Sequence, residues 1–143
     1  MVETQSYPFD LIRTPLFFDK YNSSFSKSDF DGTNKFQIVL SSVCPDNISD
    51  CLNASTGVLN NSVNNVASGD IGLEFVRQDE SNAYIAIKNN VTITLNDDID
   101  VKGVFIRKKS NGFVIFAMVN ETSMRFCDKI IFEKDNVIMQ IIG

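Results

Sequence analysis

The chain has 143 residues, 43% of them hydrophobic, which fits one ordinary domain with a packed core and excludes a disordered chain. Its formal net charge of −5, with only 13 scattered Lys and Arg residues, excludes a general nucleic-acid-binding surface. The chain has no histidine, so the commonest general base and metal ligand is missing, and Ser or Cys triads in their usual form cannot be built. We therefore expect a protein that is not an enzyme, with no catalytic residues, no metal and no cofactor.

The N-terminus predicts neither secretion nor membrane insertion. Residues 1–8 contain no positively charged region and no apolar signal region. No apolar run approaches the ~18 residues of a membrane span. We therefore expect a chain made in the cytoplasm that stays in solution and has no membrane partner.

Residues 1–33 lack a regular hydrophobic period and include Pro8 and Pro15. They are nevertheless rich in apolar side chains, which a solvated linker would not carry. We interpret them as an extended N-terminal arm that docks on a neighbouring subunit; the alternative is that they add edge strands to their own domain. The side chains expected to bind the partner are Phe9, Leu11, Ile12, Leu16, Phe17 and Phe18, and Tyr21, Phe25 and Phe30 are further exposed-looking apolar residues of this arm.

A second unit, residues 34–143, begins where apolar and polar residues start to alternate. Residues 36–40 have the period of a half-buried strand. Residues 42–70 are polar and rich in Asn, a poor helix former, which predicts a loop, and a loop this long is expected to have a function. Val58, Leu59, Val63 and Val66 fall near helical spacing, which predicts one helical turn within it. Cys44 and Cys51 flank part of this loop and could pair under oxidising conditions, although free thiols are expected.

Short strands then follow at close intervals. Alternation predicts them near residues 71–75, 84–87, 91–95 and 99–107, and Gly103 predicts a bulge or close packing in the last of these. The Asn111-Gly112 pair predicts a tight hairpin with positive φ angles, and residues 113–119, which are apolar on both faces, predict a central strand. Three more strands are expected, near residues 124–126, 130–132 and 137–142.

Eight or nine short strands without a long helix predict an all-β fold. The simplest arrangement is an antiparallel β-sandwich, Ig-like or jelly-roll-like, with the extended N-terminal arm attached. A closed barrel is the alternative.

Three charged segments are weaker signals. Residues 96–100 and 29–32 offer carboxylates that could bind Ca²⁺, but they lack EF-hand spacing, and turn chemistry explains their Asn and Asp residues. The run Arg107-Lys108-Lys109 is interpreted as a solvated hairpin tip.

The layout from Phe36 onward resembles a group of small tailed-bacteriophage virion proteins. The resemblance covers roughly 110 residues and is a pattern of strands and turns. Its elements are a strand such as Phe36-Gln-Ile-Val-Leu, a long variable loop, a strand like Val91-Thr-Ile-Thr-Leu95, the hairpin Gly103-Val-Phe-Ile-Arg-Lys-Lys-Ser-Asn-Gly-Phe-Val114, the segment Asp128-Lys-Ile-Ile-Phe132 and an apolar last strand. The resemblance implies a β-sandwich that decorates or connects parts of a virion and performs no chemistry.

The resulting hypothesis is a non-enzymatic virion structural protein assembled in the host cytoplasm. We expect an auxiliary capsid (decoration) protein, present in many copies, that binds the major capsid protein or a head-fibre or neck component. The alternative is a carbohydrate- or receptor-binding module of a tail or head fibre, with residues 42–70 as the candidate binding loop.

Overall fold

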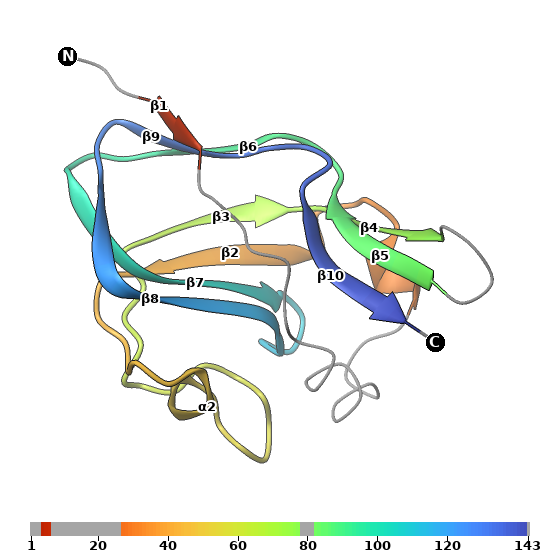
Figure 1. Cartoon of the computed structure of the whole chain (residues 1–143), viewed down its shortest axis with the longest axis horizontal. Coiled ribbons are helices and arrows are strands. Elements are labelled where there is room, and N and C mark those ends of the chain that lie inside the picture. The colour runs from red at the N-terminus through yellow and green to blue at the C-terminus, as the bar shows by residue number, and fades with distance from the viewer. Residues whose placement is uncertain (1–3, 7–26, 78–81, 143) are drawn as a thin grey trace.

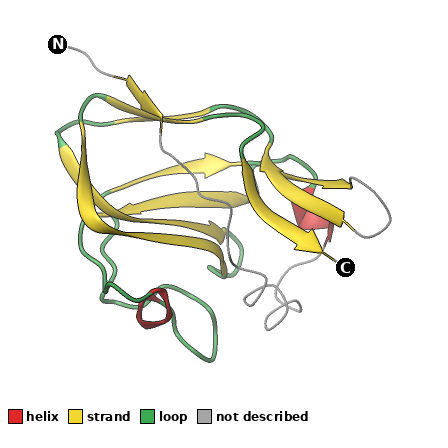
Figure 2. Ribbon diagram, in the orientation of Figure 1, coloured by secondary structure: helices red, strands yellow, loops and turns green. Residues whose placement is uncertain are grey.

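This computed structural model describes residues 4–6, 27–77 and 82–142, and in this part of the chain the fold is all-β. The only helical segments described are single turns, η2 (Lys27–Phe30) and α2 (Ile48–Cys51), as Figure 2 shows. No helix of the described part is long and apolar enough to cross a membrane. The strands are β1 (Thr4–Ser6), β2 (Phe36–Ser41), β3 (Ala67–Ile71), β4 (Leu73–Arg77), β5 (Asn82–Ile87), β6 (Val91–Thr94), β7 (Ile99–Lys108), β8 (Val114–Phe126), β9 (Lys129–Phe132) and β10 (Val137–Ile142).

The strands form three sheets that enclose a common core (Figure 1). The four-stranded sheet has the order β3-β2-β7-β8 and is antiparallel throughout. Opposite it lie the antiparallel sheet β10-β5-β4 and the sheet β1-β9-β6. The core between them takes Phe36 and Ile106 from the first sheet, Ile85 from the second and Phe132 from the third. The predicted antiparallel β-sandwich is therefore confirmed.

The long loop between β2 and β3 covers the outer face of the four-stranded sheet. Its residues Cys51 and Leu52 are buried against Val39, Phe105 and Ala117, which lie on three neighbouring strands. Because the four-stranded sheet is thus covered on both faces, its central strands read as nearly continuous apolar runs. The loop contains one helical turn, as predicted, but the turn is α2 and not the stretch from Val58 to Val66 whose spacing indicated it. The predicted loop ends earlier than expected because its last residues, from Ala67 on, belong to β3.

The prediction that residues 113–119 form a central strand is wrong in one respect. Val114 to Ala117 are buried, as expected, but β8 lies at the edge of its sheet, and β2 and β7 are central. The loop supplies the missing cover, since the Val114 amide donates to the Gly57 carbonyl at 3.0 Å. The strand expected near residues 124–126 is the far end of β8, which continues past an irregularity in its pairing with β7 near Gly103.

The hairpin between β7 and β8 is wider than the Asn-Gly pair predicts. The Gly112 amide donates to the Lys108 carbonyl at 2.8 Å, and the Lys108 amide donates to the Phe113 carbonyl at 2.8 Å. Gly112 has a φ of 74°, whereas Asn111 is not in the left-handed region. A four-residue turn of this kind needs only one positive φ.

Residues 27–33 pack against the sandwich. Phe30, which was expected to be exposed, is 4% exposed, and its ring stacks on Phe36 with centroids 5.2 Å apart. Asp31 forms an isolated antiparallel bridge to Glu74. At the other end of the described arm residues, β1 pairs in parallel with β9, so part of the leader does add an edge strand to its own domain.

Candidate functional site

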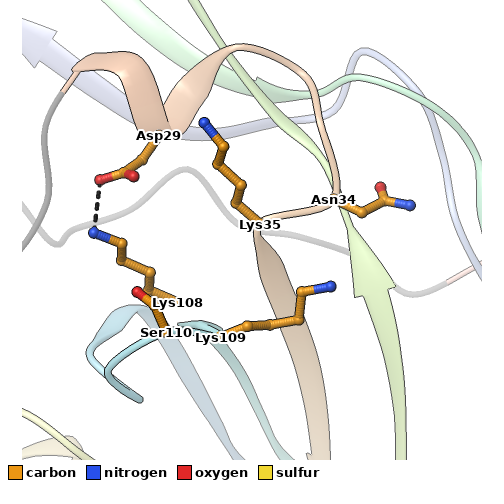
Figure 3. Close-up of a pocket in the computed structure, with 6 residues that line it drawn as sticks. All are labelled: Asp29, Asn34, Lys35, Lys108, Lys109 and Ser110. Atoms are coloured by element: carbon orange, nitrogen blue, oxygen red, sulfur yellow. Dashed lines mark ion pairs between the residues drawn. The ribbon is translucent and has the colours of Figure 1, made fainter.

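An open pocket of about 520 Å³ lies where the β7–β8 hairpin meets η2 and the start of β2 (Figure 3). The hairpin and the segment before β2 are joined by the Lys109 amide, which donates to the Lys35 carbonyl at 3.0 Å. Charged and polar side chains line the pocket: Asp29, Asn34, Lys35, Lys108, Lys109 and Ser110. The sequence singles out Lys108 and Lys109 as part of a hairpin tip and Asp29 as part of an acidic segment, but only the fold brings them together with Asn34, Lys35 and Ser110.

Each of the three ammonium groups in this pocket already has a carboxylate partner. Lys108 Nζ lies 3.0 Å from Asp29 Oδ2, as the dashed line in Figure 3 marks. Lys35 Nζ lies 3.0 Å from Asp31 Oδ2 and also donates to the Ser28 carbonyl at 2.9 Å. Since Lys109 pairs with Asp70 at 3.2 Å, an anionic ligand would have to compete with three ion pairs. The arrangement suits hydrogen bonding to a polar surface better than capture of a free anion.

The pairs differ in their access to water. The Lys108 and Asp29 side chains are 18% and 11% exposed, whereas those of Lys109 and Asp70 are 40% and 55% exposed. The prediction of a solvated tip at Arg107-Lys108-Lys109 is therefore wrong for its first two residues. Arg107 lies in β7 and donates to Gln37 Oε1 at 2.9 Å, and Lys108 is held by η2.

The acidic segment 29–32 is occupied by internal contacts. Asp31 Oδ1 accepts hydrogen bonds from the Thr33 hydroxyl at 2.6 Å and the Thr33 amide at 2.9 Å. These bonds, together with Lys35, hold the pKa of the Asp31 carboxyl well below its usual range. Turn and ion-pair contacts therefore account for this segment without a bound ion.

The acidic segment 96–100 is also engaged. It forms the turn between β6 and β7, and Arg125 of β8 lies 3.2 Å from Asp100 and 3.6 Å from Asp98. Hydrogen bonding to Asp100, with added attraction from Asp98, raises the pKa of Arg125. Within the described ranges, no group of three or more His, Cys, Asp or Glu residues is placed to hold a metal ion.

The candidate loop of residues 42–70 is used largely for packing. Its base is held by Asn64, whose Oδ1 accepts from the amides of Ser42 at 3.0 Å and Val43 at 2.7 Å. Its exposed tip, residues 53–56, is a turn in which Asn53 Oδ1 accepts from the amides of Ser55 and Thr56. The position of Asn64 could not be read from the sequence, because nothing distinguishes it from the other Asn residues around it.

The predicted partner-binding side chains all lie outside the described residues: Phe9, Leu11, Ile12, Leu16, Phe17 and Phe18. Their role stays a prediction from the sequence.

The fold and these contacts define a class: an all-β antiparallel sandwich whose charged side chains mostly stabilise turns and strand ends. No protein-family model matches the chain, and neither a curated protein nor a solved structure matches it.

Proposed function

We propose that this protein is a non-enzymatic structural protein of a tailed-bacteriophage virion. In this proposal it is an auxiliary capsid (decoration) protein that binds the major capsid protein or a head-fibre or neck component. It acts in many copies, and neither nucleic acid nor a membrane is its partner.

The pairing of β1 with β9 limits which part of the arm is proposed to dock on a neighbour. Thr4, Gln5 and Ser6 lie in register with Lys129, Ile130 and Ile131, so an extended N-terminal segment adds to the edge of a sheet. Addition of a strand to a sheet edge is a general way in which extended segments are recognised, because main-chain hydrogen bonds supply affinity. Because β1 adds to an edge of its own domain, docking on a neighbouring subunit is proposed for the apolar side chains between Phe9 and Phe18 and not for residues 4–6.

The observation that carries the proposal is the resemblance to phage virion proteins. The segments that carry it coincide with β2, β6, the β7–β8 hairpin, β9 and β10. The strand and turn spacing on which the resemblance rests therefore matches the order of strands in this structure. This agreement concerns the fold, and the virion role is inferred from it.

The proposed mechanism is burial of the arm. Each of its apolar side chains would contribute ~1.5–3 kcal/mol when fully buried in a groove of a neighbouring subunit. Ordering the backbone costs ~1–2 kcal/mol for each residue, so the two sums are comparable and each copy binds weakly. Many copies on one particle would supply the overall stability of attachment.

The test uses particles of the virus that encodes this chain, prepared without the protein. Full-length protein added to such particles is expected to sediment with them, and a variant lacking residues 1–20 is expected to remain in the supernatant. Because this truncation also removes β1, the double variant Phe17→Ser/Phe18→Ser is the matched control that keeps the strand. Absence of the protein from purified virions by mass spectrometry would overturn the proposal, and full incorporation of both variants would overturn the arm mechanism.

The carbohydrate-binding alternative gains no specific support. The exposed loop tip contains no aromatic side chain, and the carboxamide of Asn53 is used within the turn. The apolar loop residues pack in the cluster on the four-stranded sheet: Cys44, Ile48, Cys51, Leu52, Leu59 and Val63.

A further inference from the structure

Two thiols are buried together beneath the long loop. Cys44 is 6% exposed and Cys51 is 0% exposed, and both are free. They pack in the same apolar cluster as Val39, Phe105 and Ala117, on the outer face of the four-stranded sheet. Cys127 is not part of this cluster.

The loop brings these two thiols to each other. Cys44 precedes α2 and Cys51 is its last residue, so the chain between them turns back on itself. The Cys51 thiol points toward the start of this segment, 3.6 Å from the Pro45 carbonyl oxygen and 3.5 Å from that of Asn47. The two thiols are close enough for each to affect the pKa of the other.

The strand below leaves space for this arrangement. A Cβ atom at Gly103 of β7 would lie 2.9 Å from Cys44 Sγ, closer than real Cβ atoms come. A side chain at this position would push the Cys44 thiol out of its place beside Cys51. The absence of a side chain at Gly103 thus leaves room for both the Cys44 sulfur and the Phe105 ring, whose Cε2 would also lie 2.9 Å from that Cβ.

We infer that Cys44 and Cys51 are a disulfide-forming pair, which a small aliphatic disulfide such as oxidised glutathione converts to an intramolecular bond around α2. The Cys44 thiolate attacks one sulfur of the oxidant, which releases one thiolate and leaves a mixed disulfide on Cys44. The Cys51 thiolate then attacks Cys44 Sγ and expels the second thiolate. Two protein thiols are oxidised and one small disulfide is reduced to two thiols, with two protons passing to solvent or to those thiolates.

Cys44 is assigned the first attack because its thiol is less deeply buried than that of Cys51. Burial raises the pKa of both thiols, and it raises that of Cys51 to about 11. Lys102, which is ion-paired with Asp46, opposes this effect at both thiols. Of the two, Cys44 is the one with some access to solvent, 6% exposed against 0% for Cys51. Since only the thiolate is nucleophilic and both groups are buried, the reaction is slow and requires local opening of the loop.

The bond would close a ring within the loop, from residue 44 to residue 51. Closing a short ring in the unfolded chain raises stability, and for a ring of this size we expect an increase in Tm of roughly 5–10 °C. Cysteine pairs stay reduced as thiols in the cytoplasm, whereas disulfide bonds form and persist in oxidising surroundings. On the proposed virion function, the thiols would stay reduced while the particle assembles in the host cytoplasm, and the bond would form after the particle leaves the cell. This order of events rests on the proposed function, whereas formation of the bond does not.

The experiment uses full-length protein carrying Cys127→Ser, incubated with oxidised glutathione. Intact mass is expected to fall by two hydrogen atoms, peptide mapping to join Cys44 to Cys51, and Tm to rise and then return on reduction. In Cys51→Ser on the same background, the reaction is expected to stop at a glutathione adduct on Cys44, without the rise in Tm. The inference is overturned if the folded protein keeps both thiols while urea-unfolded protein forms the bond, or if the folded protein only accumulates the glutathione adduct. Neither result would bear on the virion assignment, which particle binding tests.

Discussion

The backbone of Gly72 lies directly against the backbone of Gly32, so closely that a Cβ atom at Gly72 would sit 2.3 Å from the Gly32 carbonyl oxygen. Gly72 is the single residue between β3 and β4, where the chain leaves the four-stranded sheet and enters the sheet β10-β5-β4. The Gly32 amide donates to the Leu73 carbonyl at 2.9 Å, which fixes the segment before β2 at this crossing. The passage between two sheets therefore depends on the absence of a side chain.

Gly72→Ala is expected to destabilise the protein by ~2–3 kcal/mol, because overpacking against backbone atoms cannot be relieved by a rotamer change. Gly69→Ala in β3 is the matched control, since its Cβ would meet the flexible Ile93 side chain at 3.0 Å instead. Urea unfolding followed by circular dichroism measures both. Equal stability of the two variants would contradict the role given to Gly72.

Phe30→Ala is expected to cost ~3–5 kcal/mol, the usual range for removing a buried aromatic side chain. The reason is that Phe30 stacks on Phe36 in the core, although it lies in the segment that the sequence assigns to the arm. Val43→Ala, at a side chain that is 62% exposed, is the control and should be nearly neutral. A small loss for Phe30→Ala would show that residues 27–33 are not an integral part of the sandwich.

Asn64→Ala is expected to cost ~1–3 kcal/mol, because it leaves the amides of Ser42 and Val43 without their acceptor. The loss should appear as faster hydrogen exchange at these two amides, measured by NMR or mass spectrometry. Asn61→Ala in the same loop, at an exposed side chain, should leave their exchange unchanged. Unchanged exchange in Asn64→Ala would mean that the loop base is held by other contacts.

The ion pairs of the pocket should differ in strength. A double-mutant cycle on Lys108 and Asp29 is expected to give a coupling of ~1.5–3 kcal/mol, since both groups are largely shielded from water. The same cycle on the more exposed Lys109 and Asp70 should give only ~0–1 kcal/mol. Chemical denaturation of the six variants measures both couplings, and a larger value for the exposed pair would refute this account.

Asp31 should make the stability depend on pH in the acid range. Its pKa is depressed in the folded protein by the Thr33 hydrogen bonds and Lys35, so its contribution is present above the ordinary Asp value of 3.8 and is lost as pH falls through the folded value. Asp31→Asn should therefore be less stable than the wild type at neutral pH, and the difference should shrink progressively below pH 3.8. Urea midpoints across a pH series measure this difference, with Asp97→Asn on an exposed turn as control. A carboxyl NMR titration of Asp31 at its ordinary value would contradict the prediction.

The sequence by itself determined the fold class and most of the strands. Alternation of apolar and polar residues predicts the strands β2, β5, β6, β7, β9 and β10. Successive side chains of a strand point to opposite faces of the sheet, so a strand with one buried face has an apolar residue at every second position. The polar strand β3 escaped prediction, since Ser68, Gly69 and Asp70 become a strand only by pairing with β2.

Only the tertiary structure decided which surfaces meet. It placed β8 at a sheet edge and laid the long loop over the outer face, where Cys44 meets Cys51. It also shielded Lys108 by bringing it to Asp29, far away along the chain. Local periodicity reports that a side chain is buried or exposed, whereas its partner is fixed by long-range packing that no short window of sequence contains.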